Sequence, residues 1–238
     1  MTAPVEAKRR YAYVEAAQRL LRPPSKGWKP AELLDAASKA ELGNTAWPIG
    51  RVIDSEGSSP VATTDGIEAR VWHHEPVWED YWSFQNDGSY YVVRRLEEEF
   101  GQPNFSTSQG HPTKMFWFDV RLWRIAEILL HGARLYQCLG LPPATPYSLS
   151  ITHAGLSGRE FWASQMDSAL GEALCRGRIA QTDRATWQRE LTQDYVVTNL
   201  KELVADVAEG LFVLFNFASV PRSTTDQVVE TFLRRRVR

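Results

Sequence analysis

The pattern of apolar and polar residues predicts a long helix in the middle of the chain. Its apolar positions recur every three or four residues and form one stripe, made of Leu122, Ile125, Ala126, Leu129, Leu130, Ala133, Tyr136 and Leu139. Asp119 is suited to cap the start of this helix, because its carboxylate accepts hydrogen bonds from free N–H groups of the first turn. Gly140 and Pro142 then end it. A second helical pattern, from Tyr195 to Phe217, predicts another long helix.

Helical spacing also occurs near the N-terminus, where apolar positions between Val5 and Leu21 predict a helix. The segment Arg-Pro-Pro-Ser-Lys-Gly at 22–27 ends it, because proline cannot continue a helix and glycine loosens the chain. Shorter helices are expected from Ala31 to Glu41 and from Ser223 to Arg236. We therefore expect an N-terminal helical arm and linker over residues 1–29.

Between these helical stretches the apolar period shortens to two residues, which predicts β-strands. The expected strands are 48–53, 66–73, 80–85, 89–95, 147–153 and 159–163, with a further strand inside 179–191. The segment Asn86-Asp87-Gly88 lies between two of them and predicts a hairpin, since these residues adopt positive φ at low cost. The strands at 147–153 and 159–163 are expected to pair with each other across a turn.

Strand pairs and long helices in this order predict an α+β fold. We expect a mostly antiparallel sheet covered by two long helices, with the N-terminal helical arm beside it. The expected domains are the arm and linker at 1–29, the α+β core at 30–218, and a basic C-terminal helix and tail at 219–238.

Composition and charge add limits on the class of protein. The chain has 43% hydrophobic and 24% charged residues and a formal charge of −2, so it lacks the global basic excess of many duplex-binding proteins. Cys138 and Cys175 lack metal-ligand spacing, and we expect free thiols in a reducing cytoplasm. The N-terminus has no signal-peptide pattern, and the longest apolar stretch, 211–220, is too short to cross a bilayer. We expect a cytoplasmic protein outside the membrane.

Motifs for catalysis, cofactors and metals are not expected in this chain. It has neither the phosphate-binding loop G-x-x-x-x-G-K-[ST] nor a dinucleotide fingerprint after a strand. Adjacent His73 and His74 would point to opposite faces of a strand, which disfavours a shared metal ion. Gly158 directly after Ser157 does not form a nucleophile elbow. We expect no catalytic residue, no cofactor and no metal, and titratable groups that stay scattered instead of converging in one cleft.

The turn from Thr152 to Arg159 is the best local candidate for binding an anion. Glycines in a turn free backbone N–H groups, and His153 with Arg159 are placed to meet a negative charge. The alternative is a tight connection in which Gly155 and Gly158 supply positive φ and Arg159 is solvated. Both interpretations remain open at this point.

Arginines close in sequence to aromatic residues suggest a nucleic-acid surface. The candidate binding residues are Arg94, Arg95, Arg121, Arg124, His153 and Arg159, and the neighbouring aromatic residues are Tyr90, Tyr91, Trp117, Trp123 and Tyr136. Arginine with exposed aromatic rings holds single strands through phosphate contacts and base stacking. The alternative is that Arg121 and Arg124 line the polar side of their helix and pair with the acidic run at 97–99. That run is itself expected to be a solvated helix face.

Five segments appear in an order that resembles a known family: Glu32–Ile53, Thr63–Val71, Asp80–Leu96, Phe116–Leu141 and Ser148–Glu160. Together they resemble the C-terminal region of bacterial proteins that carry an AlbA/Schlafen-type ATP- or DNA-binding domain in front. The likeness covers about Ala31 to Phe217. Residues 1–30 are too few for the front domain, so the resemblance transfers no active site. It implies an accessory, sensing or assembly module.

These observations lead to two expected functions. The first is a non-catalytic interaction, sensing or assembly module of a bacterial regulatory or antiviral system, which forms a homo-oligomer or binds a partner subunit. Abundant aromatic residues without a reaction centre favour it. The alternative is a nucleic-acid-binding protein that uses the arginine–aromatic surface.

Overall fold

The computed structural model describes residues 11–55, 58–73, 78–99, 114–163, 175, 177–217 and 221–235. Its fold is α+β and is built on a large antiparallel sheet. The seven strands follow the spatial order β2-β3-β4-β5-β1-β7-β9. Their bounds are Tyr13–Leu20 (β1), Val61–Thr63 (β2), Gly66–His73 (β3), Trp78–Gln85 (β4), Tyr90–Arg95 (β5), Tyr147–Ala154 (β7) and Arg184–Leu191 (β9). Every neighbouring pair in this sheet is antiparallel.

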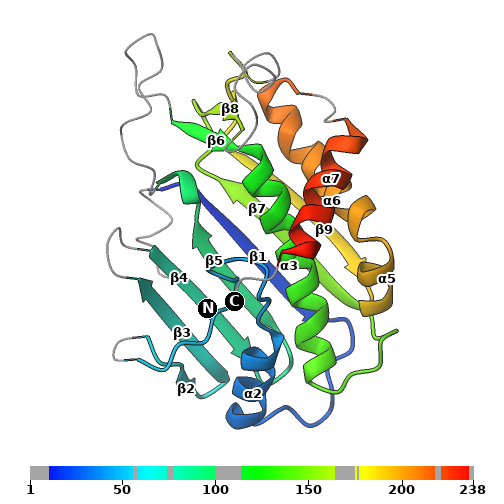
Figure 1. Ribbon diagram of the computed structural model, residues 1–238. Helices are drawn as coiled ribbons and strands as arrows, with labels where there is room; N and C mark the ends of the chain where they lie inside the picture. The colour runs from blue at the N-terminus through cyan, green and yellow to red at the C-terminus, as the bar shows by residue number, and fades with distance from the viewer. Residues whose placement is uncertain are drawn as a thin grey trace.

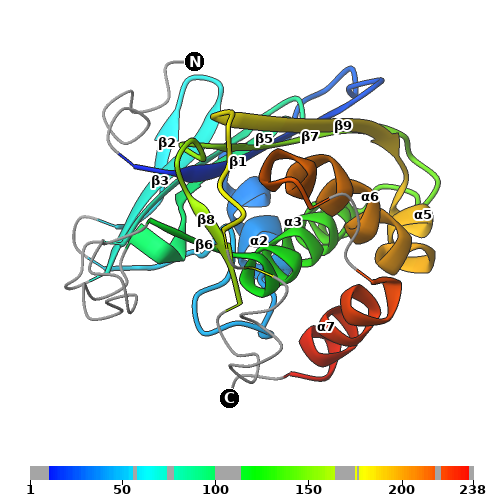
Figure 2. The ribbon, with the colours of Figure 1, turned by 90° about the horizontal axis from the view of Figure 1, so that it is seen from above.

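Helices cover one face of this sheet, as Figures 1 and 2 show. They are Pro30–Ala40 (α2), Phe118–Cys138 (α3), Gln193–Thr198 (α5), Leu200–Phe212 (α6) and Arg222–Arg234 (α7). The long helix α3 confirms the prediction from its apolar stripe, and α2 and α6 lie on either side of it. Helix α7 forms an outer layer that packs against α3 and α6 (Figure 2).

The expected helix between Val5 and Leu21 is wrong at Tyr13–Leu20, which forms β1 in the interior of the sheet, between β5 and β7. Residues before Tyr11 lie outside the described part. Alternation explains the strand, because Val14, Ala16 and Leu20 are buried against the helices while Ala17 is exposed on the opposite face. Ala16 and Ala17 favour helices intrinsically, and pairing on both edges overrides that preference. The proposed domain boundaries stay a prediction.

The second expected long helix, Tyr195 to Phe217, is broken into α5, α6 and a 3₁₀ turn at Val213–Phe215. The break falls at Asn199, whose backbone is not helical (φ −116°, ψ 29°) and whose side-chain amide donates to the Tyr195 carbonyl at 3.0 Å. The Asn199 backbone N–H donates to the same carbonyl at 2.9 Å, so Asn199 closes the last turn of α5. The α+β assignment therefore holds, with one long helix and several shorter ones.

Two short strands lie at one end of the large sheet. Met115–Trp117 (β6) and Glu160–Trp162 (β8) pair in parallel, so the segment after the glycine turn joins β6 and not β7 as expected. The rings of Phe116, Phe118 and Phe161 stack between these strands and the end of α6. The strand expected at 48–53 is absent, since these described residues form a turn and extended chain.

No helix among the residues that the structure describes has both the length and the apolar character needed to cross a membrane.

Candidate functional site

Asp80 and Arg94 face each other on the helix-covered side of the sheet. The β4–β5 hairpin places the two residues directly opposite one another, and Arg94 Nη2 lies 3.3 Å from Asp80 Oδ2. The Trp47 indole N–H donates to the same carboxylate oxygen at 2.9 Å. Both charged side chains are buried. Arg94 therefore pairs with a carboxylate inside the protein, and its buried guanidinium cannot contact a nucleic-acid phosphate at the surface.

The segment after β5 brings two more carboxylates against α3. Glu97 and Glu98 lie in a 3₁₀ turn, Glu97–Glu99 (η1), with side chains only 10% and 1% exposed. Arg121 donates to Glu97 and lies 3.3 Å from Glu98, and Arg124 Nε donates to Glu97 at 2.6 Å. The expectation of a solvated acidic face is wrong for these two residues. The expected pairing of Arg121 and Arg124 with the acidic run is confirmed.

Arg124 extends the network to the loop after α2. Its Nη1 donates to Glu127 Oε2 at 2.5 Å and to the Trp47 carbonyl at 2.9 Å. Thr45 donates to the other oxygen of Glu127 at 2.6 Å. We call Asp80, Arg94, Glu97, Glu98, Arg121, Arg124 and Glu127 the ion network. The expectation that titratable groups stay scattered is wrong, because these side chains converge between the sheet and α3.

Burial and pairing set the protonation of the acids in the ion network. Burial works against ionisation of Glu97, but the guanidiniums of Arg121, Arg124 and Arg94 outweigh it and hold the pKa of Glu97 well below its usual range. Burial raises the pKa of Asp80 and of Glu98 against the opposing pull of their arginines. Removing one partner of such a buried pair would leave an uncompensated charge inside the protein. We assign the ion network a structural role.

His153 and Arg159 are also buried, at the end of β7 and in the following turn. Burial, with a smaller contribution from the nearby Arg121, lowers the pKa of His153 to about 3. Arg159 donates from Nε to the Gly155 carbonyl at 2.7 Å and from Nη1 to the Met115 carbonyl at 3.1 Å. Gly155 and Gly158 both have φ of +76°. The glycine interpretation of this turn is confirmed, whereas a solvated Arg159 is wrong.

The remaining candidate, Arg95, points to the open face of the sheet, away from the helices. Its guanidinium lies over the Tyr11 ring at 3.2 Å from the centroid. The structure therefore brings Arg94, Arg121 and Arg124 together, places His153 close to Arg121, and leaves Arg95 apart. Among the described residues, no group of three or more His, Cys, Asp or Glu side chains is arranged to hold a metal ion.

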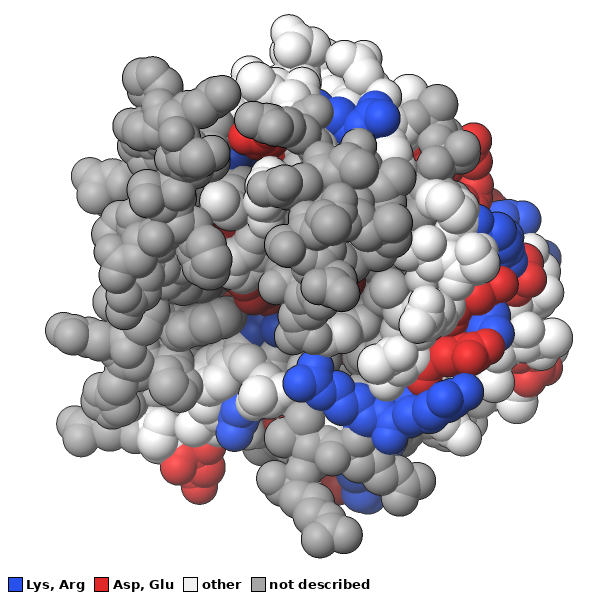
Figure 3. All heavy atoms as spheres, turned by 45° about the horizontal axis from the view of Figure 1, so that its top comes forward, with Lys and Arg blue, Asp and Glu red and all other residues white. Residues whose placement is uncertain are grey.

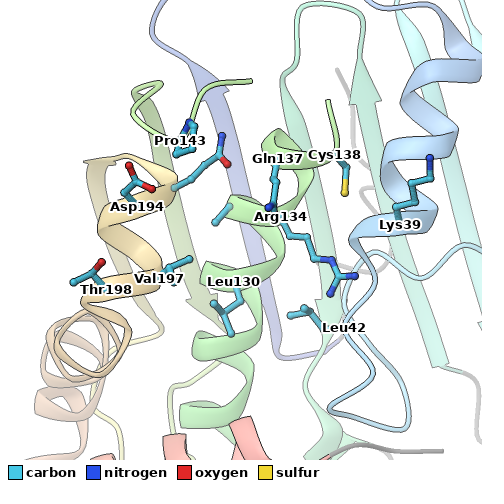
Figure 4. Close-up of a pocket in the computed structure, with 12 residues that line it drawn as sticks. Lys39, Leu42, Leu130, Arg134, Gln137, Cys138, Pro143, Asp194, Val197 and Thr198 are labelled. Atoms are coloured by element: carbon cyan, nitrogen blue, oxygen red, sulfur yellow. The ribbon is translucent and has the colours of Figure 1, made fainter. Parts of the chain in front are cut away.

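An open cavity of about 550 Å³ lies over the C-terminal half of α3, between α2 and α5 (Figure 4). We call it the α3 trough. It is lined by Lys39 and Leu42 near α2, by Leu130, Ala133, Arg134, Gln137 and Cys138 of α3, and by Pro143, Gln193, Asp194, Val197 and Thr198. Figure 4 shows Arg134 extending across the trough from α3, with Lys39 on one wall and Asp194 and Val197 on the other.

Apolar and charged groups both reach the surface of the α3 trough. Val197 is 67% exposed, although it is an apolar side chain. Arg134 is exposed and forms no ion pair among the described residues, and the same is true of Asp194. Within the described part of the chain, the one ion pair of Lys39 is with Asp35 at 2.6 Å on the exposed surface of α2. These side chains are free to contact a bound partner.

Arg134 is not placed in a site by the sequence analysis. Leu130 and Ala133 belong to the apolar stripe that predicts α3. One sequence feature could have pointed to the α3 trough. Arg134 follows Leu130 by four residues, so a charged side chain lies beside the apolar stripe on the same side of the helix. The walls come from segments about a hundred and fifty residues apart, near Lys39 and Asp194. A local sequence pattern cannot show that these two segments lie close together in the fold.

The surface of α6 and α7 carries interleaved positive and negative charges, visible along one side of the molecule in Figure 3. Lys201 pairs with Glu230 at 2.6 Å and Arg222 with Glu202 at 2.8 Å, so each pair links the two helices. This side therefore has no single sign of charge.

No protein-family model, curated protein sequence or solved structure matches this chain.

Proposed function

We propose that this chain is a cytoplasmic, non-catalytic interaction module that binds a helix of a partner protein in the α3 trough. The observation that carries the proposal is an open depression of about 550 Å³ over α3, with the exposed apolar side chain of Val197 on one wall and the charges of Arg134 and Asp194 at its surface. The resemblance to the C-terminal region of AlbA/Schlafen-type proteins adds the setting, a sensing or assembly role in a bacterial regulatory or antiviral system.

The shape and lining of the α3 trough suit a helix. Its floor is formed by α3 between Leu130 and Cys138, and its sides by Lys39 of α2 and by residues of α5 (Figure 4). Amphipathic helices bind in grooves of this kind, with their apolar face against the floor. Leu130 and Ala133 on the floor and Val197 on the wall offer apolar contact to one face of such a helix. Covering Val197 removes exposed apolar area from water, which favours association.

The charges in the α3 trough favour an acidic partner. Lys39 and Arg134 contribute two positive charges, whereas Asp194 contributes one negative charge on the opposite wall. The exposed pair of Lys39 with Asp35 contributes little stability, because water screens such pairs, so Lys39 can exchange its partner at low cost. We therefore expect an amphipathic helix with carboxylates on the side that faces α2.

Photo-crosslinking in the native cells tests this proposal. A photoreactive residue replaces Val197, and a control residue replaces Arg19, which is exposed on the opposite face of the sheet. A protein that is labelled from position 197 and not from 19 is identified, purified and titrated against the chain. We expect Arg134→Glu to weaken its binding at least about tenfold, or 1.4 kcal/mol, and Arg19→Glu to leave it unchanged. Equal labelling from both positions, or equal affinity of both variants, contradicts the proposal.

Nucleic-acid binding is the second candidate, and one surface feature favours it. Arg51 lies over Trp47 at 4.7 Å and Arg235 over Trp123 at 5.1 Å. Asn44 donates to the Arg235 carbonyl at 2.8 Å, which places the end of α7 beside the loop that carries Trp47. The arginines of the C-terminal sequence follow directly. For this candidate function, Arg51 and Arg235 take the place of the buried arginines as the proposed contacts to nucleic acid.

A labelled single strand titrated over a salt series tests this second candidate. If Arg51 and Arg235 contact phosphates, the affinity falls with salt and the double variant Arg51→Ala/Arg235→Ala has a smaller salt slope. Arg19→Ala on the opposite face is the control. No binding even at low salt excludes this function.

A further inference from the structure

Strand β9 forms an edge of the sheet with an unused hydrogen-bonding side. It pairs with β7 along its whole length, Arg184–Leu191, and it is the last strand of the described sheet on that side (Figure 1). Among the described residues, no backbone or side-chain group hydrogen-bonds to the other side of its main chain. An eight-residue edge without proline or glycine is a template for another strand. The opposite edge, β2, has only three residues.

We infer that two copies of this chain associate by pairing β9 with β9 in antiparallel orientation, which joins the two sheets into one. We choose a second copy as the partner because β9 carries both positive and negative side chains, and these can pair between two antiparallel copies of the strand. This inference does not depend on the α3 trough, which lies on α3 and its neighbours.

The backbone allows only certain registers for this pairing. In an antiparallel pair, a residue whose N–H and C=O point across the seam must face another residue of the same kind. Two identical strands meet this condition only when the two-fold axis passes through a residue position. The axis through Trp187 pairs positions 184–190 with one another, which is almost the full length of β9.

The register centred on Trp187 places opposite charges across the seam. Arg184 lies opposite Glu190 of the second copy, twice by symmetry, and Thr186 lies opposite Gln188. These four residues share the open face of the sheet, since their neighbours on β7 are on that face. Centring on Gln188 instead places Glu190 opposite Thr186 and leaves Arg184 outside the seam. Charge therefore selects Trp187 as the centre.

The inner side of the seam also fits this register. Trp187 meets its own copy at the axis, and its indole is already oriented by a hydrogen bond of 2.9 Å to Asp206. Aromatic pairs across strands contribute favourable contact. Arg189 lies opposite Ala185 of the second copy, whose small side chain leaves room for the guanidinium that contacts Asp206. Arg184 uses one nitrogen on Tyr13 at 2.9 Å and retains other donors for the seam.

A charge-swap experiment tests the pairing. The full-length chain, Arg184→Glu, Glu190→Arg and the double swap Arg184→Glu/Glu190→Arg are compared by sedimentation over a concentration range, with thermal unfolding as a check of folding. Each single variant replaces two attractive pairs with two repulsive ones, so we expect dimerisation to weaken about tenfold or more. The double swap should restore it.

If the double swap restores dimerisation, positions 184 and 190 must be neighbours in the dimer. Within one strand they are six residues, or about 20 Å, apart. They can compensate for one another only across the seam. A wild-type chain that is monomeric at all concentrations, or a double swap that is no better than the single variants, overturns the inference. Arg134→Glu in the α3 trough should leave the dimer unchanged, which separates this result from the proposed partner binding.

Discussion

Arg124 of α3 donates a hydrogen bond of 2.6 Å to Glu97 of η1, although the two residues lie 27 positions apart in the chain. The same guanidinium also donates to Glu127 and to the Trp47 carbonyl. One side chain thus links η1, α3 and the loop after α2. Because Asp80 and Arg94 continue the ion network into the sheet, the network links α3 to β4 and β5.

Replacing Glu97 by glutamine should strongly destabilise the fold. The change removes the negative charge that lies among Arg94, Arg121 and Arg124 and leaves their buried charges undercompensated. Removing one member of a buried pair costs about 3–5 kcal/mol, and we expect a loss of unfolding free energy in that range. Urea denaturation measures it.

Asp35→Asn is the matched control for this change, because it also converts an acid to its amide but breaks an exposed pair with Lys39. We expect it to leave the unfolding free energy nearly unchanged, because water screens an exposed pair. Equal effects of Glu97→Gln and Asp35→Asn would show that the ion network does not stabilise the fold.

The ion network was only partly predictable from sequence. The hairpin at Asn86-Asp87-Gly88 was expected, and its register alone places Asp80 opposite Arg94. The pairing of Arg121 and Arg124 with the acidic run was also expected. The convergence of both groups was not, because it depends on how α3 crosses the sheet. That crossing is set by packing over long sequence distances and leaves no local periodicity.

Strand β1 shows where periodicity misleads. Alternate residues Val14 and Ala16 are buried and Ala17 is exposed, but the two adjacent alanines also fit a helix. Gln18 on the helix-covered face weakens the alternation further. Its side chain donates to the Gly132 carbonyl of α3 at 3.4 Å, a contact that no local pattern predicts. The interior strand was therefore mistaken for a helix, whereas the longer apolar stripe of α3 was unambiguous.

Acid should begin to destabilise the protein below about pH 6.5, because His131 and His153 are buried in their neutral form. Burial lowers the pKa of His131 from 6.5 to about 3, helped by Arg134, and lowers that of His153 to about 3, helped by Arg121 and opposed by Glu97. Between about pH 6.5 and 3 the unfolded chain binds protons that the folded chain does not. The unfolding free energy should fall in this window by up to about 1.4 kcal/mol per pH unit for each histidine.

Asp80 and Glu98 act in the opposite direction at lower pH. Their raised pKa values mean that the folded chain binds protons before the unfolded chain does, so they offset part of the loss. Urea midpoints of the wild type, His131→Gln and His153→Gln, measured at intervals from pH 7.5 to 5, isolate the histidines. Each substitution should reduce the fall of the urea midpoint between pH 7.5 and 5. A variant with the wild-type slope would assign the acid sensitivity to other groups.

Gly155 and Gly158 offer a matched pair of substitutions, because both have φ of +76°. A Cβ at Gly158 meets nothing within 4 Å, whereas a Cβ at Gly155 would lie 2.5 Å from the Cα of Ala12, beside the start of β1. Gly158→Ala should cost about 1–2 kcal/mol for the left-handed backbone alone. Gly155→Ala should cost a further ~1–3 kcal/mol from steric overlap. Thermal or urea unfolding measures both, and equal losses would contradict the close approach to Ala12.

The short parallel pair β6–β8 should depend on Phe161. Three-residue strands cannot hold one another by backbone hydrogen bonds alone. Phe161 is fully buried and lies 5.1 Å from the Phe118 ring and 4.9 Å from the Phe212 ring. Phe161→Ala should cost about 3–5 kcal/mol, whereas Tyr195→Ala, at a ring that is 38% exposed, should cost less than about 1 kcal/mol.

Hydrogen exchange localises the effect of Phe161→Ala. The Glu160 N–H donates to the Lys114 carbonyl at 2.9 Å, at the start of the β6–β8 pair. If the ring cluster holds these strands, this amide should lose more protection than amides of β1, which pairs on both sides within the large sheet. A uniform loss of protection across β1 and β8 would instead show that the two sheets unfold as one cooperative unit.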